Sequence, residues 1–420
     1  MRFKRWIVLI FFGAWLTIFG FELVIGPVLF TPFWTAFSRL WIELTDWLDL
    51  TSTVLYRVSG LIFAFLGVGT VAFGIKHLLN SVVTVAFAGN DAEFLDYYLT
   101  LQQLRRGPKV VVIGGGTGLS TLLRGLKEFT HNITAIVTVA DNGGSSGRIR
   151  AELGTLPPGD IRSCLVALAD TEPLMKKLFE YRFGPQMTGL EGHSFGNLFI
   201  VTMSEITGDF ETAVKESSKV LAVRGEVLPS TLEDVTLVAT FTDGSKVEGE
   251  WQITATQKQI TRVELSPANV APPEEAVTAI READLVVLGP GSLYTSVIPN
   301  ILVPGIRRAV TMAKAPVVYV CNLMTQPGET DGYTVSDHLK ALAAHLGKGV
   351  VDYVVANEAV YPEDVLAKYR EQGAEPVLLD QEAVEALGVE AITGNFLVVN
   401  EHVRHLPEAL AQFLLNLVKY

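Results

Sequence analysis

Four glycines in five positions, between residues 114 and 118, mark the strongest candidate for chemistry in this chain. They stand in the run VVVIGGGTGLSTLLRGL, where a short apolar segment precedes them and an amphipathic helical pattern follows. Glycine permits positive φ angles and a close approach of the backbone to a ligand. The start of a helix offers unpaired N–H groups and the positive end of a dipole. The run therefore predicts an anion site, typically for a phosphate or diphosphate.

The spacing of these glycines does not match the dinucleotide fingerprint G-x-G-x-x-G, because Leu119 takes the last position. The motif thus predicts a phosphate contact without pointing to NAD, which disfavours an oxidoreductase. A tight strand-to-helix turn without a ligand is the structural alternative, although four glycines exceed what packing needs. The residues predicted to contact the ligand here are Gly115, Gly116, Thr117 and Gly118.

A second polar segment, residues 140–148 (ADNGGSSGR), follows the next apolar run. Its acidic residue stands about where a carboxylate meets ribose hydroxyls in nucleotide-binding folds. The glycines permit a nest of N–H groups, and the serines add hydroxyl donors. An exposed loop with an Asn-Gly turn is the structural alternative. The predicted contacts are Asp141, Asn142, Gly143 and Ser145.

Three more polar segments follow or precede helical patterns. Residues 157–162 (PPGDIR) predict a rigid turn in which Asp160 caps a helix, a structural role. Residues 192–197 (GHSFGN) open another helix, where His193 could be a general base, although a lone histidine is more often structural. Residues 289–296 (GPGSLYTS) repeat the glycine, hydroxyl and helix order of an anion site. The predicted contacts in or near these segments are Ser194, Asn197, Gly291, Ser292, Leu293 and Asn300.

Two later stretches add candidates for the same site. Residues 321–334 form a polar loop, which would contact a sugar or line an interface; its polar residues include Asn322, Thr325, Gln326, Glu329 and Asp331. Residues 400–410 place Arg404 after the last apolar run, where its guanidinium would close the site over a diphosphate or would simply be exposed. No residue is assigned a catalytic role.

These segments need a sheet that brings them together. Apolar runs alternate with helical patterns over residues 107–420, which predicts an α/β fold with a Rossmann-like, mostly parallel sheet and helices on both faces. Ligands of such sheets bind beyond the carboxyl ends of the strands. Asp243-Gly244 predicts a hairpin turn inside a small antiparallel insert at about 230–265. The predicted strands are 109–113, 133–139, 285–288, 317–321, 350–355, 377–379 and 396–399, with 235–241 and 247–253 in the hairpin; the predicted helices include 119–128, 273–283 and 335–345.

Residues 1–90 predict a membrane hairpin of two transmembrane helices, at about 6–30 and 57–77. Each run approaches the ~20 residues that a membrane helix needs. Five of the six tryptophans lie here, as an aromatic belt predicts. Basic residues precede the first run and acidic residues predominate between the runs, which favours a multi-pass protein of the cell membrane with a cytoplasmic main domain. A signal peptide is the alternative for the first run, and a buried soluble hairpin is the alternative for both runs. Residues 91–106 predict a helical connector.

Charge and cysteine content narrow the function. The net charge of −12 belongs almost entirely to residues 107–420, which argues against nucleic acid as a partner. The two cysteines, Cys164 and Cys321, are far apart and predict reduced thiols in a cytosolic compartment. The length of 420 residues favours more than one structural unit.

Several segments in order resemble the YvcK proteins, the bacterial gluconeogenesis factor family, which is related to the CofD phospholactate transferases. The resemblance covers residues 107–420 and is carried by GGGTGLSTLLRGLK, ADNGGSSGR, LPPGDIR, GHSFGN, GPGSLYTS and TQPGETDGYT. It implies a Rossmann-like core that binds UDP-N-acetylglucosamine and a regulatory role in carbon-source-dependent cell shape and peptidoglycan synthesis. The expected partners are this nucleotide sugar, the membrane through the N-terminal hairpin, cell-wall synthesis proteins and a second copy of the chain in a homodimer.

The CofD relatives imply an alternative, a metal-dependent transferase that takes a phospholactyl group from a nucleotide-activated donor with Mg²⁺. The family pattern after the second strand is Asp-Asp-Gly-Gly, whereas this chain has Asp141-Asn142. An amide in place of a carboxylate weakens a divalent-metal site, so binding is favoured over transfer and no metal is assigned. Asp141, Asp160 and His193 are the candidates under the transferase alternative.

Overall fold

The computed structural model describes residues 3–25, 52–87, 99–170, 173–399 and 403–418. The chain divides into two compact units, residues 1–102 and 103–420, which are described separately. The predicted loop between the two apolar runs and the first half of the predicted connector lie outside the described residues.

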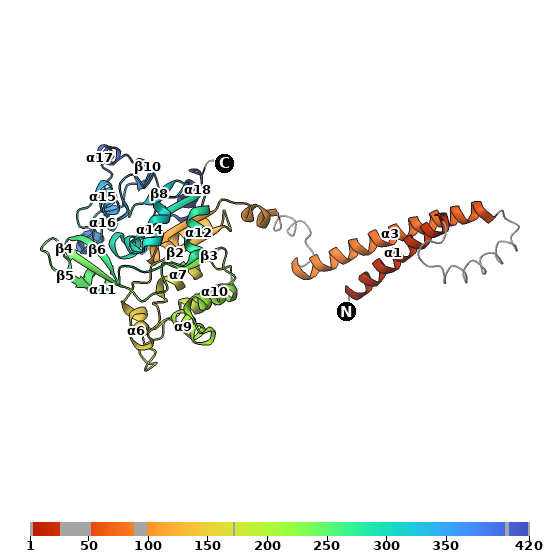
Figure 1. Ribbon diagram of the computed structural model, residues 1–420, viewed down its shortest axis with the longest axis horizontal. Helices are drawn as coiled ribbons and strands as arrows, with labels where there is room; N and C mark the ends of the chain where they lie inside the picture. The colour runs from red at the N-terminus through yellow and green to blue at the C-terminus, as the bar shows by residue number, and fades with distance from the viewer. Residues whose placement is uncertain (1–2, 26–51, 88–98, 171–172, 400–402, 419–420) are drawn as a thin grey trace. The chain divides into compact units, whose positions relative to one another are not determined.

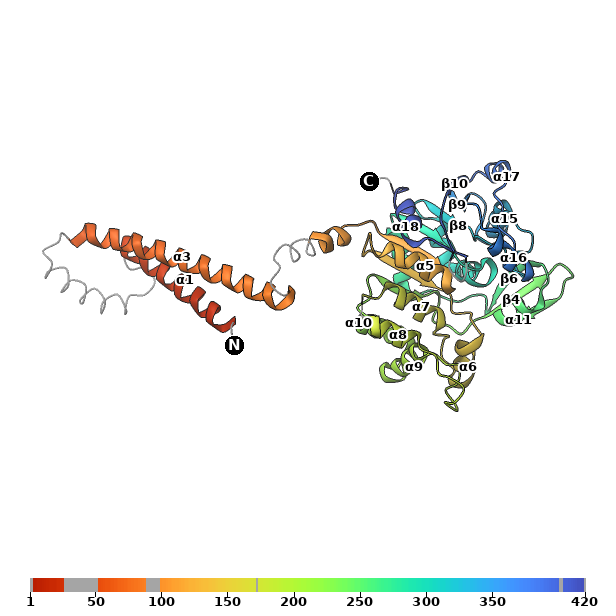
Figure 2. The same ribbon diagram turned by 180° about the vertical axis from the view of Figure 1, so that it is seen from behind.

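The N-terminal unit is a hairpin of two helices, α1 (Phe3–Ile25) and α3 (Ser52–Phe87), which lie side by side in Figures 1 and 2. By length and composition, Lys4–Ile25 and Arg57–Leu79 could each cross a membrane. Glycines occupy the contact line between the helices. A Cβ atom at Gly13 would lie 2.8 Å from the backbone nitrogen of Val71, and one at Gly60 would lie 2.7 Å from the carbonyl oxygen of Gly20. Without side chains at these positions, the two backbones can approach closely.

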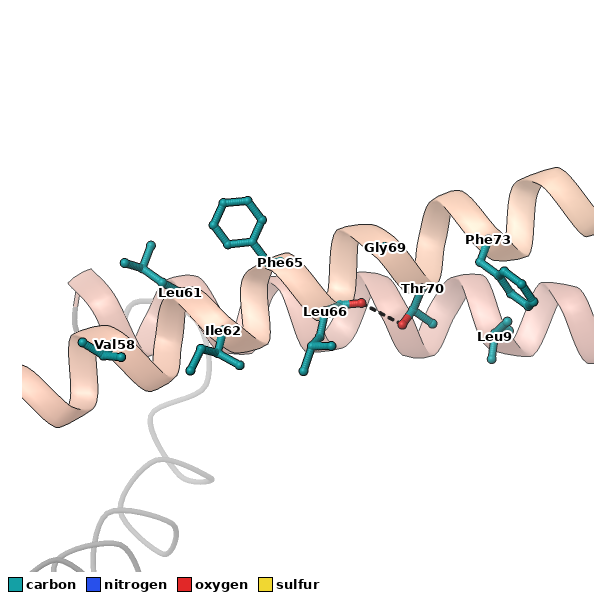
Figure 3. A pocket seen from close by; sticks show the side chains of 9 residues that line it. All are labelled: Leu9, Val58, Leu61, Ile62, Phe65, Leu66, Gly69, Thr70 and Phe73. Carbon is teal, nitrogen blue, oxygen red and sulfur yellow. Dashed lines mark hydrogen bonds between the residues drawn. The ribbon is translucent and has the colours of Figure 1, made fainter.

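The outward face of the hairpin carries large apolar side chains. Phe11 and Phe65 are 73% and 76% exposed. Figure 3 shows a shallow groove on this face, lined mainly by apolar side chains of α3. Its one hydroxyl, on Thr70, donates to the carbonyl oxygen of Leu66 at 2.7 Å, so the groove presents little polar surface. Such a face suits hydrocarbon better than water.

The second unit is built on a seven-stranded parallel sheet with the order β10-β9-β8-β7-β1-β2-β3. Every residue of β1, β7 and β8 is buried, because helices cover both faces (Figures 1 and 2). The predicted Rossmann-like α/β fold is thereby confirmed. The strands are β1 (Val110–Gly114), β2 (Ile133–Val137), β3 (Glu226–Pro229), β7 (Leu285–Leu288), β8 (Val317–Val320), β9 (Tyr353–Asn357) and β10 (Glu390–Gly394).

The helices bury apolar stripes against this sheet. In α5 (Gly116–Leu126), for example, Leu119, Leu122, Leu123 and Leu126 repeat at helical spacing and are fully buried. The predicted helices at 119–128, 273–283 and 335–345 are confirmed as α5, α12 and α15. The remaining helices of this unit that matter for its packing are α6 (Gly144–Leu153), α7 (Gly159–Leu168), α8 (Pro173–Glu180), α9 (Phe195–Thr207), α10 (Phe210–Val220), α12 (Glu274–Glu282), the π-helical turn η1 (Leu293–Val297), α13 (Ile298–Leu302), α14 (Pro304–Thr311), α15 (Val335–Leu346), α16 (Glu363–Glu371), α17 (Gln381–Ala386) and α18 (Pro407–Leu415).

The antiparallel insert is present as a three-stranded sheet with the order β5-β4-β6. Its elements are β4 (Thr236–Phe241), β5 (Lys246–Glu248), the helix α11 (Glu250–Thr256) and β6 (Ile260–Ser266). The predicted second hairpin strand, 247–253, is wrong after Glu248. Gly249 has a φ of +92°, which ends the strand, and α11 begins at the next residue.

Three strand predictions in the last third of the chain need correction. Residues 377–379 form no strand, and the edge strand of the large sheet is β10 instead. The strand predicted at 350–355 lies at β9, three residues later at its start. Residues 397–399 form β11 (Leu397–Val399), which pairs with β12 (Val403–His405) in a separate antiparallel sheet.

Candidate functional site

The glycine-rich turns meet at the carboxyl edge of the large sheet, where the strand order reverses. From β1 the sheet continues to β2 and β3 on one side and to β7, β8, β9 and β10 on the other. Ligands of open α/β sheets bind in the crevice at such a switch point. A cleft of about 470 Å³ opens there. The predicted residues that line it are Gly115, Gly116, Thr117, Gly118, Asp141, Gly291, Ser292 and Arg404, together with Asn322, Thr325 and Gln326.

The two glycine turns pack directly on each other. A Cβ atom at Gly118 would lie 2.8 Å from the carbonyl oxygen of Pro290, so only glycine allows this contact. Gly116 begins α5 with a φ of +65°, a conformation that favours glycine. Asn300 links the segments that carry the two turns. Its Nδ2 donates to the carbonyl oxygens of Gly114 at 3.0 Å and Ser296 at 2.7 Å. The result is a cradle of bare backbone at the start of an eleven-residue helix, a suitable place for a phosphate group.

Three carboxyl groups line the same cleft: Asp141 after β2, Asp160 in α7 and Glu250 in α11. Burial, reinforced by the charge of Asp141, raises the pKa of Asp160 to about 6, although the N–H of Gly116 donates to its carboxylate. Burial and the charges of Asp141 and Asp160 raise the pKa of Glu250 well above its usual range. The carboxyl group of Glu250 shares a hydrogen bond with that of Asp141, which contributes to the rise.

Glu250 was not expected in the site, and Asp160 was expected there only under the transferase alternative. The predicted capping role of Asp160 is wrong: the residue before α7 is Pro158, no side chain caps the helix, and Asp160 lines the cleft instead. A Cβ atom at Gly115 would come within 2.5 Å of the Asp160 carboxylate, which shows how closely the glycine turn approaches it. The motif GDIR held a signal, since an acidic residue in the first turn of a helix can face a ligand at that end of the helix. Glu250 carried no such signal because it lies in the insert.

Arg404 is the one cation among the described residues that line the cleft. It lies on β12, whose position is fixed by a hydrogen bond from the N–H of Val403 to the Tyr369 hydroxyl at 2.9 Å. Its neighbour His405 is buried, and burial lowers the pKa of this histidine to about 4. His405 is therefore neutral, and Arg404 alone supplies positive charge to the cleft.

Seven predicted contacts do not line the cleft. Asn300 and Leu293 are fully buried behind it. The other five are Asn142, Gly143, Ser145, Ser194 and Asn197.

Ser194 caps α9 by accepting the N–H of Asn197 at 3.2 Å, and Asn197 Nδ2 donates to Ser145 Oγ at 3.1 Å. Ser145 also pairs with His193 Nδ1 at 3.1 Å, so this buried network joins α6 to α9. Burial and nearby Arg148 lower the pKa of His193, which keeps the network uncharged.

Asn142 is turned toward the insert. Its Oδ1 accepts the N–H of Trp251 at 3.0 Å, and its Nδ2 donates to Gln252 Oε1 at 2.8 Å. The amide therefore does not stand in the place of a second carboxylate in the cleft. The carboxyl groups beside Asp141 come from Asp160 and Glu250, so Asn142 does not decide whether a metal ion binds in the cleft.

The described residues contain no group of three or more His, Cys, Asp or Glu side chains arranged to hold a metal ion. Magnesium commonly uses only one or two carboxylates together with phosphate oxygens. Asp141 and Asp160 are the oxygen donors that would serve if such an ion entered with a diphosphate. Asp141 already accepts a hydrogen bond from the N–H of Gly143 at 2.7 Å and shares another with Glu250.

Comparison with known proteins identifies close relatives. Residues 110–397 match the family described as 2-phospho-L-lactate transferase CofD. The gluconeogenesis factor of Bacillus subtilis is 50% identical over 313 residues, which cover 74% of this chain and 98% of that protein. A Nostoc sp. protein, likewise named a gluconeogenesis factor, is 48% identical over 98% of this chain and 90% of its own length. The crystal structure of protein BH3568 from Bacillus halodurans is 50% identical and has a TM-score of 0.72, covering 74% of this chain and 99% of that chain.

Proposed function

The chain belongs to the CofD family and, within it, to the gluconeogenesis factors of the YvcK type, and on this basis we propose that its second unit binds UDP-N-acetylglucosamine. The protein would act as a regulator of cell shape and peptidoglycan synthesis in response to the carbon source. The site is the cleft between β1 and β7.

The interlocked glycine turns carry this proposal. The start of α5 and the turn around Gly291 expose backbone at the switch point of the sheet, where a diphosphate would accept N–H hydrogen bonds. Arg404 would add a charge-assisted hydrogen bond to the same group. Asp141 and Asp160 favour neutral hydroxyl groups as neighbours, because like charges in a cleft repel. We therefore place the diphosphate at α5 and Arg404, and the hydroxyls of ribose or sugar at the carboxylates.

The N-terminal hairpin would tether this domain to the cytoplasmic face of the cell membrane. The proposal rests on two long apolar helices with an apolar outward face. A cysteine introduced between the two helices should react with an impermeant reagent in intact cells. Labelling only after the membrane is broken would contradict the proposed orientation.

Calorimetry on residues 103–420 tests ligand binding directly. The relatives of this length show that the unit forms a protein by itself. We expect UDP-N-acetylglucosamine to bind without a divalent metal. Arg404→Ala should weaken binding about 10- to 100-fold, since a charge-assisted hydrogen bond contributes roughly 1.5–3 kcal/mol. Arg308→Ala, at an exposed position of α14, is the matched control. Absence of binding, or equal effects of the two variants, would overturn the proposal.

A metal-dependent phospholactate transferase is the second candidate, favoured by the meeting of Asp141, Asp160 and Glu250 in one cleft. The same protein, given nucleotide-activated donors and Mg²⁺, would then release a nucleotide product. Turnover that disappears in Asp141→Ala and Asp160→Asn would establish the transferase in place of the binding protein. Continued ligand binding with no product would support the first proposal.

A further inference from the structure

Helix α11 of the insert bridges the two sides of the cleft. Glu250, its first residue, lines the cleft and shares a hydrogen bond with Asp141. Thr254, one turn later, lies 3.5 Å from the buried carboxyl of Glu329, which in turn accepts from Thr295 at 3.0 Å. The helix therefore touches the loop after β2 at its start and the loop after β8 farther along. The three-stranded insert is connected to the cleft through this helix.

Asn142, in the loop after β2, holds the start of α11. Both polar atoms of its amide are used, one by the N–H of Trp251 and one by Gln252 Oε1. Gly249, which precedes the helix at a φ of +92°, makes this approach feasible. A Cβ atom at Gly249 would overlap Asn142 Nδ2 and Gln252 Oε1. An aspartate at position 142 would keep the acceptor but lose the donor, so the amide fits both partners.

A ligand that contacts Asp141 meets the start of this helix, because Asp141 and Glu250 line the cleft together. A sugar or ribose hydroxyl that bonds to the Asp141 oxygen facing Glu250 competes with Glu250 for that oxygen. Displacing Glu250 moves the first turn of α11, while the two Asn142 hydrogen bonds keep that turn attached. Trp251, the next residue, is 64% exposed and packs beside Gly143. Movement of the turn changes the surroundings of this indole ring.

We infer that Asn142 is a positioning residue that couples occupancy of the cleft to the insert by holding α11 against the loop after β2. This inference rests on the proposed binding function and assigns its output to the exposed side of α11. A ligand can shift a conformation only through contacts that differ between the two states. Here the differing contact is the hydrogen bond between Glu250 and Asp141, and the insert is the element that responds.

Trp251 makes the coupling measurable. It is the only tryptophan of residues 103–420, since the other five lie at or before position 47. In a protein of residues 103–420, UDP-N-acetylglucosamine should shift the wavelength of the tryptophan fluorescence emission. In Asn142→Ala, the emission without ligand should already be shifted, and the ligand-induced change should be largely lost. Affinity, measured by calorimetry, should fall about tenfold or less, because the lost hydrogen bonds do not touch the ligand.

Variants at the other end of the tether keep the test decisive if Asn142→Ala does not fold. Gln252 is exposed, and Gln252→Ala should reduce the fluorescence response, whereas Gln252→Glu retains the acceptor and should restore it. Asn416→Ala, an exposed asparagine after α18, is the control and should match the parent protein. Normal binding with an emission response unchanged in Asn142→Ala and Gln252→Ala would overturn the inference and leave the binding proposal intact. No binding in calorimetry would overturn the binding proposal, and identical ligand-free emission in Asn142→Ala and the parent would refute the tether independently.

Discussion

The burial of the Glu329 carboxyl group, in the loop after β8, can be tested quantitatively through the pH dependence of stability. Its side chain is 2% exposed, and only Oε1 has hydrogen-bond partners, while Oε2 has none. Burial raises its pKa from 4.5 to about 7, against the opposing effect of the hydrogen bonds it accepts. At ~1.4 kcal/mol per pKa unit, this shift corresponds to ~3 kcal/mol of folding free energy that depends on pH.

Because the pKa of Glu329 is raised in the folded protein, the free energy of unfolding falls as pH rises. Below pH 4.5 the carboxyl group is protonated in both the folded and the unfolded chain. Between 4.5 and about 7 the unfolded chain ionises while the folded protein keeps its proton, so the free energy of unfolding falls as pH rises. Above this range the destabilisation is fully present. From pH 5 to pH 8 the loss amounts to roughly 2.5 kcal/mol.

Glu329→Gln removes this dependence because an amide does not titrate here. In thermal unfolding of residues 103–420, the parent protein should lose about 5 °C more than Glu329→Gln between pH 5 and pH 8, at roughly 2 °C per kcal/mol for a domain of this size. Glu371→Gln, at an exposed position of α16, is the control and should follow the parent protein. Parallel pH profiles for the parent and Glu329→Gln would show that Glu329 does not carry a buried proton.

Three further predictions follow from the packing. Gly118→Ala should lower stability by about 1–3 kcal/mol in thermal unfolding and abolish ligand binding, because its methyl group would press the two glycine turns apart. The methyl group of Gly116→Ala would meet no atom within 3.4 Å, so this variant should lower stability by only about 1–2 kcal/mol, through its positive φ. In the hairpin, Gly67→Leu should separate α1 from α3, whereas Gly69→Leu, with no atom within 4 Å, should not, as measured by cross-linking of cysteines placed on the two helices. Asn197→Ala should lower stability by about 1–2 kcal/mol and leave affinity nearly unchanged in calorimetry, since Asn197 supports Ser145 outside the cleft.

The central strands of the sheet were predictable, and the edge strands were not. β1, β7 and β8 are buried on both faces, so their sequences are continuous apolar runs. β3 and β10 begin with glutamates, and β10 contains no fully buried residue, so neither shows a strong apolar pattern. The insert was found from its turn, but Gly249 redirected the chain into α11, which residue alternation alone does not reveal.

The phosphate cradle could be predicted because its residues are close in sequence. The glycines after β1 and β7 each form a compact motif, and parallel pairing of β1 with β7 brings the two motifs together. The carboxyl group of Glu250 could not be assigned in this way, because Glu250 lies in the insert, 109 positions after Asp141 in the sequence. Its place depends on hydrogen bonds from Asn142 to α11, which are tertiary contacts.

The same hydrogen bonds change how Asp141-Asn142 bears on function. Asp141 lines the cleft, whereas Asn142, the next residue of the loop after β2, bonds to α11. The missing carboxylate at 142 therefore does not argue against a metal. Asp141 accepts a hydrogen bond from the N–H of Gly143 and shares another with Glu250, which favours binding of a neutral ligand group beside it. A carboxylate held in this way is placed to exchange one of these contacts for a ligand hydroxyl.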